Sequence, residues 1–183
     1  MTLLKIARMG HPVLLVKAEQ VEDIGDPMIQ SLIDDMIETM SDAGGVGLAA
    51  PQVHVSKRIF VYCIPLSRQQ EVSDANDTVQ VLINPVITPE GHEQVLRPEG
   101  CLSIPGLRGW IPRYLQVRYE GSDRMGRAVS GIAHGFRANV MQHEADHLDG
   151  ILYPMRMKNL GMMGFETEFS RFLTPEAVAE MIL

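Results

Sequence analysis

Cysteine and long apolar runs are both scarce in this sequence, and each absence excludes a class of protein. Cys63 and Cys101 are the only cysteines among 183 residues, too few for the disulfide framework of a small secreted domain. No stretch approaches the roughly 18 apolar residues that a membrane-spanning helix needs. The first residues contain no long apolar segment followed by a small-residue cleavage site, which argues against a signal peptide. We therefore expect a cytoplasmic protein without a membrane partner.

Basic residues are also in short supply. The chain has 16 Lys and Arg against 23 Asp and Glu, and a formal net charge of −7. Such an acidic surface repels phosphate backbones, so we expect no direct nucleic-acid binding. Hydrophobic residues make up 45% of the chain, which is enough for a sizeable core, and the length suits one domain of ordinary size. We therefore predict one domain over residues 1–183.

Helices are indicated by apolar residues at helical spacing and by residues that suit helix ends. One helix is predicted at 27–43, where Asp26 suits an N-cap and Pro27 the first helical position. A second is predicted at 136–148, and a short carboxy-terminal helix begins after Thr174. These three segments account for the predicted helices.

Strands are indicated by segments rich in Val and Ile and by a pattern typical of a hairpin. They are predicted at 58–64, 79–87, 114–120 and 127–133. Pro85 places part of the second strand near a sheet edge or a strand end, and the polar segment 69–78 predicts a surface loop. Short links without intervening helices favour antiparallel pairing. The pattern therefore predicts an α+β fold.

The strongest chemical signal is the segment Gln142-His143-Glu144-Ala145-Asp146-His147. Histidines four residues apart lie on one face of a helix, so His143 and His147 can both bind one metal ion. Glu144 is offset around the helix and can approach a water on that ion without binding the ion itself. This H-E-x-x-H pattern predicts a hydrolytic metal site.

A catalytic site of this kind needs a third protein ligand and one open position. The metzincin pattern requires histidine at position 153, which is Tyr153. Glu166 or Glu168 could serve as in thermolysin-like proteases, although both lie in a tail typical of an amphipathic helix. The other donor is Cys101, in a loop-like segment, because a thiolate is a strong ligand for borderline metals.

Three segments in the same order resemble the peptide deformylase family. They are Gly45-Val46-Gly47-Leu48-Ala49-Ala50-Pro51-Gln52, Glu99-Gly100-Cys101-Leu102-Ser103 and Gln142-His143-Glu144-Ala145-Asp146-His147-Leu148-Asp149-Gly150. The resemblance extends from the first helix to about residue 156. Pro51 stands where many members carry threonine and others carry proline, so it agrees with the assignment.

This resemblance implies a single catalytic domain that removes the formyl group from the N-terminal methionine of nascent peptides. It implies a divalent metal held by Cys101, His143 and His147, with water in the fourth position. Glu144 is the implied proton carrier. The implied donors to the oxyanion are the Gln52 side-chain amide and the Leu102 backbone N–H. The fold it implies has antiparallel sheets around a central metal-binding helix.

The resemblance also implies a substrate site, a metal and a partner. The expected substrate-binding residues are Gly45, Val46 and Gly47 for the peptide backbone, and Phe136 and Val140 for the methionine side chain. Glu99 and Arg113 are candidates for supporting the ligand segment. The expected physiological metal is iron(II), with zinc or nickel in preparations. Contact with the ribosome near the nascent-chain exit, through residues 165–183, is a further expectation.

Two alternatives use the same motif differently. A small zinc endopeptidase would take Glu166 or Glu168 as its third ligand. A non-enzymatic binding module would hold a structural ion with four protein ligands, for which His134 and Asp146 are the candidates beyond Cys101 and the motif histidines. Replacing Cys101 tests the first alternative and replacing Glu144 tests the second.

Overall fold

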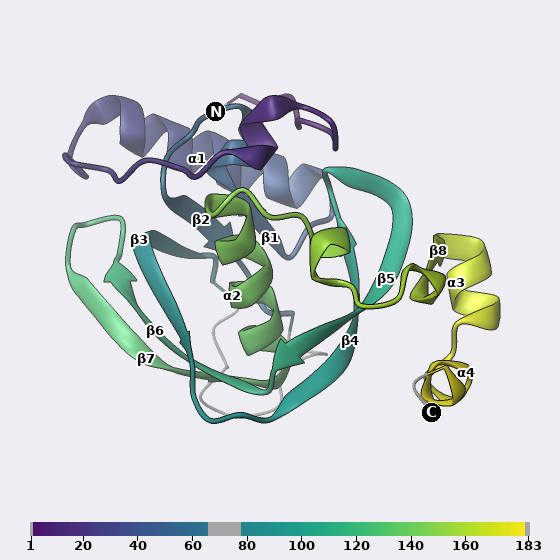
Figure 1. Ribbon diagram of the computed structural model, residues 1–183. Coiled ribbons are helices and arrows are strands. Elements are labelled where there is room, and N and C mark those ends of the chain that lie inside the picture. Colours follow the sequence, from purple (N-terminus) through teal and green to yellow (C-terminus); the bar gives the residue numbers. More distant parts are fainter. Residues whose placement is uncertain (1, 66–77, 182–183) are drawn as a thin grey trace.

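The computed structural model describes residues 2–65 and 78–181, and in it two antiparallel sheets flank the helix α2 (Gly135–Leu148) (Figure 1). The five-stranded sheet has the order β1-β2-β3-β6-β7 and the three-stranded sheet the order β4-β5-β8. The predicted α+β fold around a central metal-binding helix is therefore confirmed. The predicted loop at 69–78 lies, except for its last residue, outside the described residues.

The structure adds strands to those predicted from the sequence and changes the bounds of the predicted ones. The larger sheet contains β1 (Gly47–Ala49), β2 (Ile59–Tyr62), β3 (Gln80–Pro89), β6 (Gln116–Ser122) and β7 (Ala128–His134). The smaller sheet contains β4 (Gln94–Cys101), β5 (Ile104–Tyr114) and β8 (Met163–Phe165). The hairpin predicted at 114–120 and 127–133 corresponds to β6 and β7.

Helix ends follow the capping residues. The α-helices are α1 (Pro27–Asp42), α2, α3 (Glu166–Phe172) and α4 (Pro175–Glu180), and the short 3₁₀ helices are η1 (Pro12–Leu15), η2 (Ala50–Val53), η5 (Tyr153–Arg156) and η6 (Leu160–Met162). The Asp26 side chain accepts from the Met28 N–H at 2.8 Å at the start of α1, and the Thr174 hydroxyl accepts from the Ala177 N–H at the start of α4. No helix in the described part of the chain is long and apolar enough to cross a bilayer.

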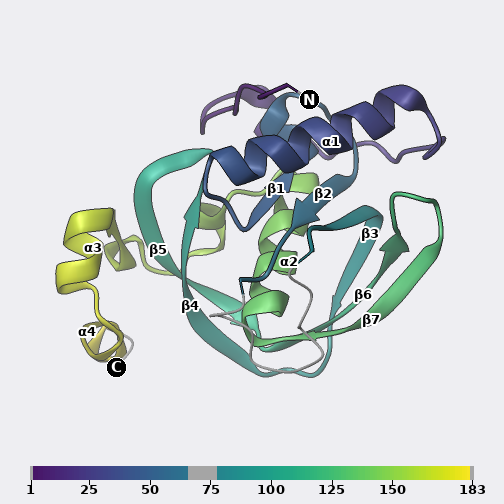
Figure 2. The same ribbon diagram turned by 180° about the vertical axis from the view of Figure 1, so that it is seen from behind.

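The larger sheet is covered by a helix on each face, as the packing of the β2 side chains shows. Ile59 and Val61 pack in the cluster that contains the apolar face of α1, whereas Phe60 and Tyr62 pack in the cluster that contains α2. Successive side chains of a strand point to opposite faces. Because a helix covers each face of the sheet, all four side chains are buried. Figure 2, which gives the view from behind, shows α1 lying across β1 and β2. The core therefore places α2 between the two sheets.

Strand β3 lies between β2 and β6, but its pairing with β2 ends at Ile83. Pro85 therefore lies in the part of β3 that pairs with β6 alone, which agrees with the expectation of a sheet edge there. The chain forms a bulge there, and the pairing with β6 shifts between Ile83 and Val86. Asn84 adopts a left-handed conformation with φ of 51°, and its side chain bonds both the N–H and the C=O of Val21, at 2.8 and 2.9 Å. A bulge accommodates a proline that cannot donate to the sheet.

Candidate metal centre

Helix α2 carries the H-E-x-x-H motif, and its Gln142 side chain bonds it to the smaller sheet. The Gln142 amide accepts from the Tyr114 N–H at 3.0 Å and donates to the Tyr114 C=O at 2.9 Å, which joins α2 to the end of β5. One turn apart on the helix, the rings of His143 and His147 meet edge to face with centroids 4.9 Å apart. Both imidazoles therefore face the same point beside β4.

Strand β4 supplies Cys101, which the sequence placed in a loop-like segment. The strand pairs with β5 from Gln94 onward, and its register shifts between Gly100 and Cys101, just before the turn. Pro98 interrupts a strand pattern, but β4 is the edge of its sheet, where a missing N–H costs no ladder bond. The shift brings the Cys101 sulfur within 3.3 Å of the His147 Nε2.

The three side chains form a group that suits one metal ion. Ligand atoms of Cys101, His143 and His147 all lie within 4.8 Å of one another. Metal–ligand bonds of about 2.0–2.3 Å in a tetrahedral site place ligand atoms at separations of this order. Burial alone would raise the pKa of the Cys101 thiol, but the His147 and His143 imidazoles hold it well below its ordinary value. The sulfur therefore favours the thiolate form that binds metals.

A chain of charged side chains, buried except for Arg156, orients His143. Its Nδ1 lies 2.8 Å from Glu99, so Nε2 is the nitrogen left for a metal. Glu99 accepts two bonds from Arg113, at 2.7 and 3.0 Å. Arg113 also donates to Asp146 at 2.6 Å, and Asp146 accepts a further bond of 2.6 Å from Arg156. Glu99 and Arg113 thus lie where the sequence suggested support for the ligands, whereas Arg156 was not predicted.

Gln52 lies beside the sulfur with its amide orientation set by the backbone. Its Oε1 accepts from the Ala49 N–H at 2.8 Å, so its amide N–H groups point the other way. There, Nε2 lies 3.2 Å from the Ser103 hydroxyl and 3.5 Å from the Cys101 sulfur. Gln52 is 1% exposed. A neutral donor is therefore fixed at the metal site, next to the turn that contains Leu102.

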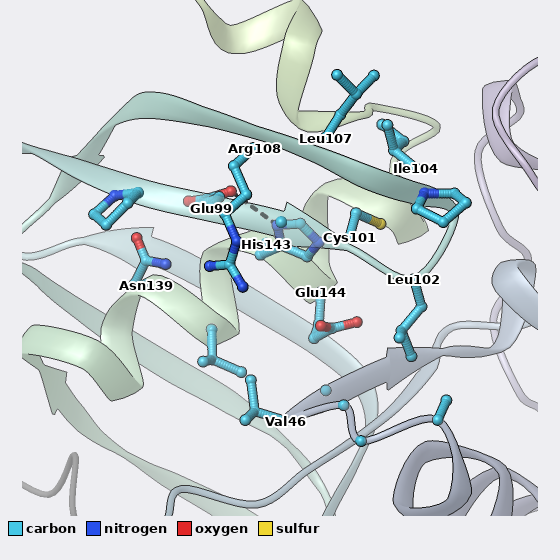
Figure 3. Close-up of a pocket in the computed structure, with 18 of the residues that line it drawn as sticks. Val46, Glu99, Cys101, Leu102, Ile104, Leu107, Arg108, Asn139, His143 and Glu144 are labelled. Carbon is cyan, nitrogen blue, oxygen red and sulfur yellow. Dashed lines mark hydrogen bonds and ion pairs between the residues drawn. The ribbon is translucent and has the colours of Figure 1, made fainter. Parts of the chain in front are cut away.

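Glu144 is 4% exposed, and its Oε2 has no hydrogen-bond partner. Burial raises the pKa of Glu144 to about 7. In Figure 3 its carboxylate projects into the cavity beside His143. A Cβ at position 47 would overlap this carboxyl group, so only glycine fits at Gly47. An unpaired buried carboxylate is costly and indicates a group kept for a reactant.

The cavity in front of these residues has a volume of about 610 Å³. Its lining includes the five residues expected to bind substrate, which are Gly45, Val46, Gly47, Phe136 and Val140. Leu102 and Asn139 lie toward opposite sides of it (Figure 3). Asn139 is 5% exposed and its Oδ1 has no partner. Its position one turn before His143 is the one signal for it in the sequence.

Comparison with known proteins decides the family. The model of the family described as Polypeptide deformylase matches residues 3–162. The chain belongs to this family. It is 44% identical over 161 residues to Peptide deformylase 1 of Nitrosomonas europaea, covering 87% of this chain and 90% of that protein. It is also 44% identical over 173 residues to Peptide deformylase 1 of Bordetella pertussis, with coverage of 94% and 97%.

A solved deformylase structure has the same fold. The class I type b peptide deformylase from Acinetobacter baumannii, bound to Met-Ala-Ser, is similar with a TM-score of 0.77 and 34% identity, over 85% of this chain and 99% of that chain. The activity is that of a peptide deformylase, a metallohydrolase that removes the N-formyl group from nascent peptides. The resemblance found in the three sequence segments is confirmed.

The deformylase family excludes both alternatives, and the geometry agrees. Among the described residues, Cys101 is the one that completes a group of three ligands with the motif histidines. Glu166 instead forms an ion pair with Arg108 at 2.8 Å. The candidate fourth ligand Asp146 faces two arginines. The endopeptidase and the structural metal site, the two alternatives to the predicted deformylase, are therefore excluded.

Proposed function

We propose that Glu144, Gln52 and Leu102 perform the chemistry of deformylation on a metal held by Cys101, His143 and His147. One observation carries the proposal: a thiolate and two imidazoles converge within 4.8 Å beside a buried carboxylate oxygen without a partner. A bound divalent ion would acidify water and polarise the formyl oxygen. Residues of the protein itself carry out the remaining steps.

Glu144 is the proton carrier. It takes a proton from the attacking water as the new bond to the formyl carbon forms, and it delivers this proton to the amine nitrogen as the C–N bond breaks. Formate and a free amino terminus are the products. The buried Glu144 carboxyl group has an oxygen without a protein partner, and it is therefore free to accept a proton from a reactant and to release it again, as this double role requires.

Gln52 and Leu102 stabilise the negative charge on the formyl oxygen. The bond from the Ala49 N–H to the Gln52 Oε1 keeps the Nε2 donors directed toward the sulfur and the reacting group. The backbone N–H of Leu102 is the second donor, next to the ligand Cys101. Donors that are oriented before reaction need no reorganisation as charge develops, which lowers the barrier.

The substrate backbone pairs with Gly45, Val46 and Gly47. This segment leads into β1, an edge strand of the larger sheet, and an edge can accept an added peptide strand. The Gly45 position is close to the site as well, since a Cβ there would lie 2.9 Å from Leu102. Phe136 and Val140 contact the methionine side chain from α2. The Met-Ala-Ser complex of the Acinetobacter baumannii relative supports a peptide of this kind.

We further propose the identity of the metal ion, the cellular location of the protein and its partner. Iron(II) is the proposed physiological ion, because the thiolate and two imidazoles accept iron, zinc, cobalt or nickel and family members are associated with iron. The whole chain, residues 1–183, acts as one catalytic domain in the cytoplasm. It meets nascent chains near the ribosomal exit, and residues 165–183 are the proposed contact.

Formate release from formyl-Met-Ala-Ser tests the proposal under anaerobic conditions with iron(II)-loaded protein, with acetyl-Met-Ala-Ser as the substrate control. Glu144→Gln should lower kcat roughly 10²–10⁴-fold and leave the metal content unchanged. Glu168→Gln is the matched control, because Glu168 is exposed on α3, and it should retain full activity. Formate release by Glu144→Gln at the wild-type rate would overturn the assignment.

A further inference from the structure

A second hollow adjoins the metal site behind Leu102. It has a volume of about 1020 Å³ and is lined mainly by the amino-terminal segment. Ala43, Leu102 and Pro105 line both this hollow and the cavity of the metal site, so these residues form the wall between them. In Figure 3 Leu102 lies at the side of the cavity away from Asn139. The hollow is therefore next to the end of the site assigned to the formyl group.

The charge of this hollow is opposite to that of the chain. Its lining includes Lys5, Arg8, His11 and His54, and none of the described residues that line it is acidic. The net charge of the chain is −7, which on average repels an anion. The two cationic side chains, Lys5 and Arg8, reverse this locally, because a concave surface of one sign concentrates ions of the opposite sign.

The backbone fixes these side chains relative to the metal site. The residues on each side of Arg8 are hydrogen-bonded to residues of the metal site. The Ala7 N–H donates to the Gln52 C=O at 2.7 Å, and the Met9 N–H donates to the Ser103 C=O at 2.8 Å. Gln52 and Ser103 both contact the Cys101 sulfur. Arg8 is thereby attached to the back of the proposed oxyanion site.

The two histidines form a pair in the hollow. Their ring centroids are 4.6 Å apart, with the rings nearly perpendicular. The His11 Nδ1 accepts from the Val13 N–H at 3.2 Å, which leaves Nε2 as the protonated nitrogen and a donor. His54 adopts a left-handed conformation with φ of 66°, a position that favours glycine. Its side chain is exposed and is available to a ligand.

We propose that this hollow is a binding site for a small carboxylate, and that its ligand is the formate released by deformylation. This inference rests on the proposed function, because only hydrolysis at the metal produces formate. Formate leaves the reaction at Gln52 and Leu102, carries one negative charge and is too small to need a shaped pocket. The cationic side chains of Lys5 and Arg8 attract it, and His11 donates a hydrogen bond to it.

The test is a titration of zinc-loaded protein with sodium formate, followed by the ring Cε1–H signals of His11 and His54 in NMR spectra. Sodium chloride at equal ionic strength is the salt control. We expect saturable shifts of both signals with formate alone, and at least fivefold weaker binding in Arg8→Gln and in Lys5→Gln. Lys17→Gln is the matched control, since Lys17 is exposed and outside the hollow, and it should bind formate like the wild type.

The outcomes separate this inference from the proposed function. Unchanged histidine signals, equal shifts with chloride, or wild-type formate affinity in Arg8→Gln would each overturn the formate site, even in an enzyme that deformylates normally. Folding of each variant is checked by its thermal midpoint and metal content. Saturable binding of formate by a protein that releases none from formyl-Met-Ala-Ser would instead refute the proposed function and, with it, the source of the ligand.

Discussion

Glu99→Gln is the sharpest test of the charged chain behind the metal site. The Glu99 side chain is 2% exposed, and both of its oxygens accept from Arg113. Burial alone would raise its pKa, but hydrogen bonds from His143 and Arg113 lower the pKa from 4.5 to about 2. Glutamine keeps the shape of the side chain and removes the charge, so the substitution isolates the ionic contribution.

The size of the effect follows from this pKa. A decrease of the pKa from 4.5 to about 2 corresponds to roughly 3–4 kcal/mol of stability, at about 1.4 kcal/mol for each pKa unit. Because the pKa is lower in the folded state, this stability is fully present above pH 4.5. It is lost as the pH falls from 4.5 toward 2, where Glu99 becomes protonated in the folded protein. Glu99→Gln lacks the contribution at every pH.

Urea unfolding measures the prediction, with a chelator present so that metal binding adds nothing to the stability. At pH 7 the free energy of unfolding of Glu99→Gln should be roughly 3–4 kcal/mol below that of the wild type, and the difference should shrink as the pH approaches 2. Glu90→Gln is the matched control, because its ion pair with Arg118 is exposed and contributes less than about 1 kcal/mol. A decrease below about 0.5 kcal/mol for Glu99→Gln would refute the reasoning.

Three further predictions concern single positions. Gly47→Ala should lower kcat/KM roughly 100-fold with unchanged metal content, because the new Cβ displaces the Glu144 carboxylate; normal turnover would contradict this. Asn84→Ala should lower the urea unfolding free energy by roughly 2 kcal/mol without changing kcat, since it loses two bonds to Val21. Cys101→Ser should lose its metal on dialysis, measured by elemental analysis, and retention of one equivalent would exclude the thiolate as a ligand.

The elements that were predicted are those specified by neighbouring residues. The helices predicted at 27–43 and 136–148 correspond to α1 and α2 within one residue at every end, because apolar spacing and end signals are local. The placement of His143 and His147 on one face of a helix needs only a four-residue separation. The hairpin of β6 and β7 was predicted for the same reason.

The elements that were missed depend on partners far along the chain. Strand β4 contains Pro98 and Gly100, which oppose a strand locally, and it forms because β5 pairs with it along one side. The bulge at Pro85 depends on Asn84 bonding to Val21. The Asn139 Oδ1 without a partner is recognisable only once the residues around it are known.

The sequence alone determined the chemical inventory of this deformylase: two imidazoles one helical turn apart, a carboxylate beside the first, and a cysteine in a segment shared with its family. The tertiary structure decided that these groups meet. Cys101 and His147 are 46 residues apart, and their contact depends on the pairing of β4 with β5 and on the docking of α2 through Gln142. Such contacts are set by packing between distant segments, which periodicity and capping residues do not encode.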